Sequence, residues 1–143
     1  MILALMMGRA KSTGFPKKNL KKVLGRSLFE YPLIACKKSK YVDKIFVSTD
    51  CPIISRKSNK YGATYIKRPK NLANKKALGD HVYEHGYFQM KKILNLNVSD
   101  IEFVVLLMAN APTITAKLID KGIHILRKNK KFDSAVTTSI YNM

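Results

Sequence analysis

The stretch that decides the fold is ILALMM at residues 2–7, followed directly by GRAKSTGFP at residues 8–16. Six consecutive apolar residues, too few for an independent helix, predict a strand buried on both faces of a sheet. The glycines, the proline and the polar residues that follow predict a loop. Arg9 is the first basic residue and comes after the apolar run, which is the reverse of the order in a signal peptide.

The same change from apolar strand to polar loop recurs along the chain. Strand patterns lie at residues 44–48, 63–67, 102–108 and 134–138, with residues 102–108 (EFVVLLM) the clearest central strand. Helical patterns lie between them, at residues 27–39, from Pro52 to Gly62, over residues 78–94, and after a capping Thr115. The alternation predicts one α/β domain over residues 1–143, with a Rossmann-like, mostly parallel sheet sandwiched by helices.

Composition limits the classes of function. The 143 residues are 46% hydrophobic and 25% charged, which suits a globular core. No apolar run approaches the roughly 20 residues that a membrane span needs. The formal net charge of +18 attracts polyanions such as nucleic acid, anionic membrane or nucleotide phosphates. The cations are mostly lysines spread in pairs along the chain, so a solvated lysine surface is favoured over nucleic-acid binding. A localisation or nucleic-acid patch at the Lys17–Lys22 run is a minor alternative.

Two further patterns bear on metals and redox state. Cys36 and Cys51 have no CxxC spacing, which favours two semi-buried free thiols in a reduced, cytoplasmic protein over a zinc site. His81 and His85 form an H-x-x-E-H pattern on a predicted helix, but no third ligand is identifiable. A polar helix face is the favoured interpretation of these histidines.

The loop after the first strand is the best candidate for chemistry, because ligands of such sheets bind beyond the carboxyl ends of the strands. It combines two glycines with cations and hydroxyls, contributed by Gly8, Arg9, Lys11, Ser12, Thr13, Gly14, Lys17 and Lys18. These groups could cradle a phosphate. The spacing matches neither a Walker A loop nor G-x-G-x-x-G. On spacing alone, an ordinary solvated loop is therefore as good an interpretation as a phosphate-binding loop.

The stretch from Leu3 to Leu20 also resembles the acylneuraminate cytidylyltransferases (CMP-sialic acid synthetases), whose signature runs Ala-Arg-x-x-Ser-Lys-Gly-x-Pro-x-Lys-Asn. The resemblance continues in order through nearly the whole chain, at residues 39–43, 47–50, 60–63, 68–69, 72–73, 104–107 and 112. It implies that a nonulosonic acid attacks the α-phosphate of CTP and releases pyrophosphate with Mg²⁺ assistance.

The resemblance also implies roles for individual residues. Arg9 and Lys18 would bind the triphosphate and stabilise the leaving group as the catalytic cations. Ser12 and Gly14 would face phosphate, whereas Asn19, Arg68 and the backbone around Ala77 would lie near the cytidine. Four positions depart from the family: Thr13 replaces the loop Lys, with Lys11 nearby as a candidate substitute, Gly79 replaces a nucleotide-binding Ser, Met108 a sugar-binding Gln, and Asn110 the metal-binding Asp of related deoxy-octulosonate cytidylyltransferases.

The family continues beyond the point matched by Met143, with acidic metal ligands, much of the sugar pocket and the dimerisation element. We therefore expect CTP, a sugar acid and Mg²⁺ as ligands, with metal-binding residues not identifiable in this chain and a homodimer left open. Nucleic acid and membrane are not expected partners. The alternative to a cytidylyltransferase is a non-catalytic remnant that binds a nucleotide or another polyanion.

Overall fold

A computed structural model describes residues 1–11, 14–74 and 77–138. The main sheet is built from four strands in the spatial order β5-β4-β1-β6, and every neighbouring pair is parallel. This confirms the predicted α/β class with a parallel sheet. The strands are β1 (Ile2–Met7), β4 (Lys44–Thr49), β5 (Ala63–Lys67) and β6 (Phe103–Met108).

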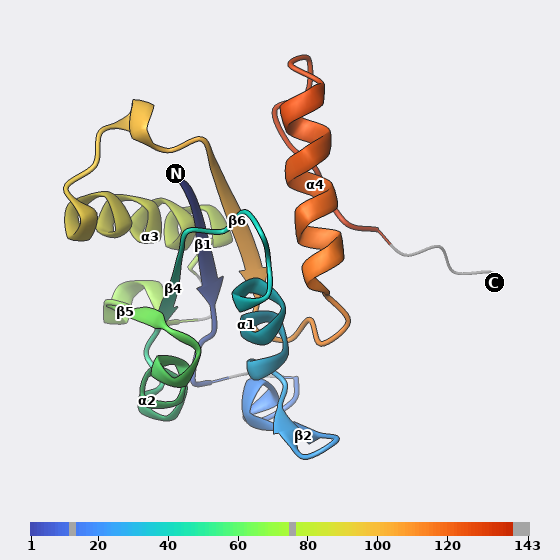
Figure 1. The fold of residues 1–143 in the computed structure, drawn as a ribbon. Helices are drawn as coiled ribbons and strands as arrows, with labels where there is room; N and C mark the ends of the chain where they lie inside the picture. The colour runs from blue at the N-terminus through green and yellow to red at the C-terminus, as the bar shows by residue number, and fades with distance from the viewer. Residues whose placement is uncertain (12–13, 75–76, 139–143) are drawn as a thin grey trace.

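Helices cover both faces of this sheet (Figure 1). Alternate β1 residues Ile2, Ala4 and Met6 pack into a core with side chains from helices α1, α2 and α4. Leu3 and Leu5 point the other way and share a second core with α3. The bounds of the helices are α1 (Glu30–Lys37), α2 (Pro52–Ser58), α3 (Gly79–Leu94) and α4 (Ala116–Lys128). Because both faces are covered, β1 is buried almost throughout, as the apolar run predicts.

The segment before α1 differs from the sequence prediction. Residues 27–29 were expected to be helical, but a small antiparallel hairpin of β2 (Lys22–Val23) and β3 (Arg26–Ser27) precedes the helix. The Ser27 amide donates to a Glu30 carboxylate oxygen at 2.8 Å. Pro32 is the third residue of α1, where its missing amide hydrogen removes no intrahelical bond.

Two predictions about strands are wrong: that residues 102–108 form a central strand, and that residues 134–138 form a fifth strand. Within the described ranges β6 pairs only with β1 and is an edge strand, so Leu106 is 49% exposed and Met108 is 52% exposed. Residues 134–138 form no strand; instead, Ala135 lies 3.8 Å from the position that a Cβ on Gly122 of α4 would occupy. An edge strand with an apolar sequence looks like a central strand until its neighbours are known.

The other helix boundaries agree closely with their signals. Thr115 caps α4 by accepting a hydrogen bond from the Leu118 amide at 3.2 Å. Pro52 opens α2, which is followed by a 3₁₀ turn, η2 (Asn59–Tyr61), and by Gly62 at φ 74°. Three further 3₁₀ turns connect the elements: η1 (Lys18–Leu20), η3 (Lys70–Leu72) and η4 (Val98–Asp100). No helix in the described part of the chain is long and apolar enough to cross a bilayer.

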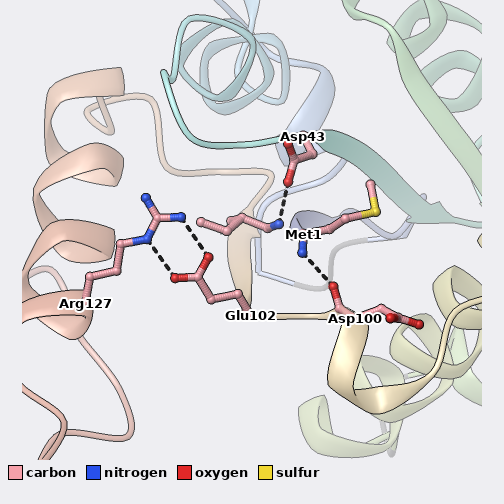
Figure 2. Close-up of polar contacts among 6 residues, drawn as sticks. Met1, Asp43, Asp100, Glu102 and Arg127 are labelled. Carbon is pink, nitrogen blue, oxygen red and sulfur yellow. Dashed lines mark hydrogen bonds and ion pairs between the residues drawn. The ribbon is translucent and has the colours of Figure 1, made fainter.

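The amino ends of the strands are held by a polar cluster (Figure 2). The Met1 ammonium donates to the Asp100 carbonyl, and the Ile2 amide donates to the Asp43 carboxylate, both at 2.6 Å. Glu102, just before β6, accepts two hydrogen bonds of 2.7 Å from the Arg127 guanidinium of α4. Both side chains of that ion pair are about 40% exposed, so solvent screens their attraction and the pair adds little to stability.

A pair of helical glycines tests how tightly the core is packed. A Cβ on Gly86 of α3 would lie 2.5 Å from a methyl carbon of the fully buried Leu5, whereas one on Gly122 of α4 has nothing nearer than 3.8 Å. We expect Gly86→Ala to lower the free energy of unfolding by about 1 kcal/mol or more. Gly122→Ala should raise it by up to about 1 kcal/mol, because alanine favours the helix. Urea unfolding of the two variants measures both effects, and equal stabilisation by both would contradict this packing.

Candidate functional site

The carboxyl ends of the parallel strands meet at one edge of the sheet, and the candidate site lies there. A cavity of about 190 Å³ opens at this edge. Its lining comes from the ends of β1 and β6, from residues just after β1, β5 and β6, and from η1. The lining residues are Met7, Arg9, Lys18, Asn19, Arg68, Met108 and Asn110. Six of these seven, all but Met7, were singled out from the sequence.

Thr49, at the end of β4, ties the neighbouring strand ends together. Its buried hydroxyl donates to the Gly8 carbonyl and accepts from the Cys51 amide at 3.0 Å. The Gly8 amide in turn donates to the Ser48 carbonyl at 3.2 Å. The end of β1 is thereby fixed against β4 just where the loop of the candidate site begins.

Asp50 fixes the next turn of that loop. Its carboxylate accepts a hydrogen bond of 2.7 Å from the Ala10 amide. Asp50 does not cap helix α2, because the residue at its N-cap position is Cys51. Asp80 likewise lies inside the first turn of α3, and the N-cap residue there is Leu78.

Gly8 is needed for close packing. A Cβ at this position would lie 3.0 Å from the Ala109 Cβ, 3.3 Å from Ile54 Cδ1 and 3.6 Å from Asn19 Nδ2. Any side chain would therefore push apart the segments after β1 and β6. At Gly14 a Cβ would meet no atom of the described residues within 4 Å, so their packing places no such demand there.

Arg68 is a buried cation at the base of the cavity. Only 7% of it is exposed, and its Nη2 donates to the Ser48 carbonyl at 2.7 Å while its Nε approaches Ser48 Oγ at 3.4 Å. Burial lowers the pKa of the guanidinium, the nearby Asp50 carboxylate opposes that shift, and Arg9 adds to it. An arginine stays charged even when its pKa is lowered, so the cavity keeps this positive charge.

Arg9 and Asn19 connect the first loop to its surroundings. The Arg9 Nη1 donates to the Asn74 carbonyl at 3.3 Å, and the Asn19 Nδ2 donates to the Arg9 carbonyl at 3.2 Å. Asn19 is buried, and its own carbonyl accepts from the Phe29 amide at 3.2 Å. The first loop is therefore held from both sides, by η1 and by the segment after η3.

The remaining predicted residues are not part of the cavity lining. Gly14 is exposed, Ala77 donates its amide to Asn74 Oδ1 at 3.0 Å, and Gly79 is the exposed first residue of α3. Ser12 lies outside the described residues. Sequence reasoning gave no role to Met7, Ser48 or Thr49. For Ser48 and Thr49 the sequence did contain a signal, because two hydroxyl residues followed by Asp50 stand at the end of an apolar strand.

Tyr83 of α3 contacts Met108 but is not itself part of the cavity lining. The Tyr83 hydroxyl lies 3.6 Å from the Met108 sulfur. Burial raises the pKa of Tyr83, and the negative charge of Asp80 raises it further. The phenol is therefore neutral at physiological pH. Phe15, in the first loop, is 51% exposed and does not line the cavity.

The described residues do not fit a magnesium ion held by this chain. Carboxylates are the usual protein ligands of Mg²⁺, yet no carboxylate lines the cavity, and Asn110 offers only an uncharged amide. No group of three or more His, Cys, Asp or Glu side chains in the described ranges could hold a metal. The two cysteines are free and buried, which agrees with the predicted unpaired thiols.

Comparison with known proteins places this geometry in a family. The family model described as cytidylyltransferase matches residues 3–141. The chain belongs to the cytidylyltransferase family. This agrees with the resemblance seen in the sequence from Leu3 onward.

Two curated relatives in the cytidylyltransferase family match nearly the whole chain. The N-acylneuraminate cytidylyltransferase of Escherichia coli is 25% identical over 142 residues, which is 99% of this chain and 32% of the relative. A Helicobacter pylori protein named pseudaminic acid cytidylyltransferase and UDP-2,4-diacetamido-2,4,6-trideoxy-beta-L-altropyranose hydrolase is 24% identical over 98% of this chain and 26% of its own length. The chain thus spans about a third of the length of these relatives or less.

Solved structures support the cytidylyltransferase fold. A CMP:2-keto-3-deoxy-manno-octonic acid synthetase complexed with CTP aligns with a TM-score of 0.64 and 14% identity, covering 90% of this chain and 48% of that one. A cytidylyltransferase from Leptospira borgpetersenii also aligns with a TM-score of 0.64, at 19% identity, covering 90% of this chain and 50% of its own. The chain accounts for about half of each of these structures.

The tie between the strand ends can be tested by removing one hydroxyl. Thr49→Val keeps the shape of the side chain but leaves the buried Gly8 carbonyl and Cys51 amide without this partner. We therefore expect the free energy of unfolding to fall by about 1–3 kcal/mol. Thr64→Val on the exposed surface of β5 is the matched control and should change stability by less than about 0.5 kcal/mol. Equal urea midpoints for the two variants would show that Thr49 does not have this role.

Proposed function

We propose that this chain forms the nucleotide-binding half of a cytidylyltransferase that activates a sialic-acid-like nonulosonic acid with CTP. The observation that carries the proposal is the composition of the cavity. Arg9, Lys18 and Arg68 supply three positive charges, Asn19 and Asn110 supply amides, and no carboxylate belongs to the lining among the described residues. The cavity also lies at the strand edge where ligands of parallel sheets bind.

The triphosphate is assigned to the two cations at the mouth of the cavity. Arg9 and Lys18 are both half-buried, so their charges are less screened than those of the exposed surface lysines. Arg68 lies deeper and already donates to Ser48. It contributes its charge to the field in the cavity, and its bonds to Ser48 keep it in place.

In the proposed reaction the anomeric hydroxyl oxygen of the sugar acid forms a bond to the α-phosphorus of CTP. The bond from that phosphorus to the bridging oxygen of the β-phosphate breaks, pyrophosphate leaves, and the hydroxyl proton passes to solvent. Arg9 and Lys18 would stabilise the negative charge that grows on pyrophosphate. Electrostatic stabilisation and positioning are the main requirements of such a transfer.

The sugar acid is assigned to the side of the cavity formed by Met108 and Asn110. Met108 is apolar and 52% exposed at the open edge of the sheet, so it offers contact without the hydrogen bonds of an amide. Asn110 is exposed and can donate or accept. Met108 ends β6 and Asn110 follows it, and the outer edge of β6 has no partner strand in the described ranges.

A second candidate, binding of a nucleotide without turnover, is favoured by the absence of a carboxylate from the cavity lining. Pyrophosphate release from CTP with a sialic-acid-like sugar separates the two functions. Release by this chain supports the cytidylyltransferase. Selective CTP binding without release, seen by calorimetry, supports the binding module and overturns catalysis by this chain alone.

Lys18 provides the sharpest test of the phosphate assignment. We expect Lys18→Ala to weaken CTP binding about 10- to 100-fold, as the loss of a charge-assisted hydrogen bond does. Lys92→Ala, on the exposed surface of α3, is the matched control and should leave the affinity unchanged. Calorimetry with CTP measures both variants. Equal affinities would remove Lys18 from the site.

Metal removal tests the charge balance of the cavity. Because its lining has three cations and no carboxylate, we expect CTP to bind to this chain in the presence of EDTA within about threefold of its affinity with Mg²⁺. The same calorimetric titration with and without EDTA checks this. Loss of binding on chelation would mean that a metal site on the chain is required.

A further inference from the structure

The hairpin of β2 and β3 ends in an unusual turn. Leu24 and Gly25 form its two central positions, with φ of 47° and 81°. The hairpin projects from the end of the molecule where β1 terminates (Figure 1). Leu24 is 92% exposed, the highest value among the exposed large hydrophobic side chains.

Neither backbone conformation nor packing accounts for a leucine at this position. Two-residue turns with both φ values positive favour Asn-Gly or Asp-Gly, because the left-handed region costs other residues about 1 kcal/mol or more. At 92% exposure Leu24 also gains almost no burial within the described part of the chain. A leucine here is explained by contact with something outside the chain.

The base of the hairpin is firmly held. The Tyr31 hydroxyl donates to the Val23 carbonyl. The Leu28 amide donates to the Lys21 carbonyl at 2.9 Å. The exposed leucine is thus presented on a braced support.

The surroundings of Leu24 are apolar and cationic. Val23 is 44% exposed, and the exposed Phe15 ring lies beneath the Lys21 ammonium at 5.3 Å from its centroid. The chain has no acidic residue before Glu30, whose carboxylate is engaged by the Ser27 amide and the Tyr61 hydroxyl. The exposed cations around the turn are Lys17, Lys21, Lys22 and Arg26.

We propose that this hairpin tip, Val23 and Leu24 with the flanking cations, docks onto an anionic lipid surface. Aliphatic side chains enter the boundary between head groups and acyl chains, while Lys and Arg lie over the lipid phosphates. An aliphatic tip cannot stack on bases or read their edges, so nucleic acid fits these residues less well. The sequence-based expectation of no membrane partner rested on the absence of a spanning run, which such docking does not need.

The chemistry of the tip fits a bilayer better than a folded protein pocket. Two adjacent aliphatic side chains form a small protruding contact that needs no shaped complement, and the cations around them need only a dense array of negative charge. Only Lys21 and the two residues of β2 separate the turn from η1, which contributes Lys18 to the cavity lining, so docking would hold the nucleotide cavity near the lipid surface.

The test is co-sedimentation of the full chain with vesicles of phosphatidylcholine alone or mixed with phosphatidylglycerol. Binding is expected only to the anionic vesicles. Leu24→Asn should weaken it roughly fivefold to tenfold, by removing the inserted side chain. The melting temperature should stay equal or rise, because asparagine suits a positive φ. Val136→Asn, at another exposed aliphatic residue, should leave binding unchanged.

Lys22→Gln tests the cationic part and should weaken binding by roughly fivefold. Failure of the wild-type chain to bind anionic vesicles would overturn the proposal. Undiminished binding of Leu24→Asn would overturn it too, because it would show a general attraction of a basic surface to anions. In that case heparin should compete equally well against both proteins. None of these outcomes bears on the CTP site, which these substitutions leave intact.

Discussion

The Thr49 hydroxyl is the interaction on which the site depends. It joins the carbonyl of Gly8, at the end of β1, to the amide of Cys51, at the start of α2. Those two segments carry the first loop and the Asp50 carboxylate that holds it. Arg68 then bonds to Ser48, one residue before Thr49, so a cation from the end of β5 is anchored to the same point. Three strand ends are thereby brought to one place.

Charge gives this place its chemistry. Placing three cations around a cavity of about 190 Å³ costs free energy in the absence of an anion, since like charges repel and burial removes water. The lowered pKa of Arg68 is the sign of that cost. A polyphosphate would relieve it, and a bare metal ion would increase it. The surface lysines carry most of the net charge of +18, but they are solvated and screened. The cations around this cavity are therefore the ones that can select a particular anion.

The sequence pattern predicted correctly the strand that is buried on both faces and paired on both edges, and it failed for the strand that has a neighbour on one edge only. Residues 2–7 are buried on both faces, and their apolar run locates β1 to the residue. Residues 103–108 have an equally apolar run, yet β6 is an edge strand, because burial depends on neighbours that the run itself cannot specify. The short hairpin before α1 was missed since two-residue strands leave no periodic pattern, and Leu24 is not a usual turn residue.

For the site, motif order was more informative than local spacing. Spacing alone left the first loop equally compatible with a solvated loop, while the ordered resemblance selected six residues that the fold gathers into one cavity. It also assigned positions near Ala77 and Gly79, which lie outside that lining. Neither motif order nor spacing predicted the support beneath the cavity, because it consists of bonds between residues distant in sequence: the Thr49 hydroxyl donates to the Gly8 carbonyl, and the Ser48 carbonyl accepts from the Arg68 guanidinium.

The central claim is that CTP binds at the strand edge beside Arg9 and Arg68. Titration of the ¹⁵N-labelled chain with CTP, followed by amide chemical shifts, tests it directly. We predict that the largest shifts fall at residues 8–11, 18–19, 68 and 109–110, around the cavity. Another cavity, lined by Cys36, Tyr61 and Gly62 among others, lies at the opposite edge of the sheet and should show no shifts. Shifts centred there, or spread evenly over the surface lysines, would contradict the account.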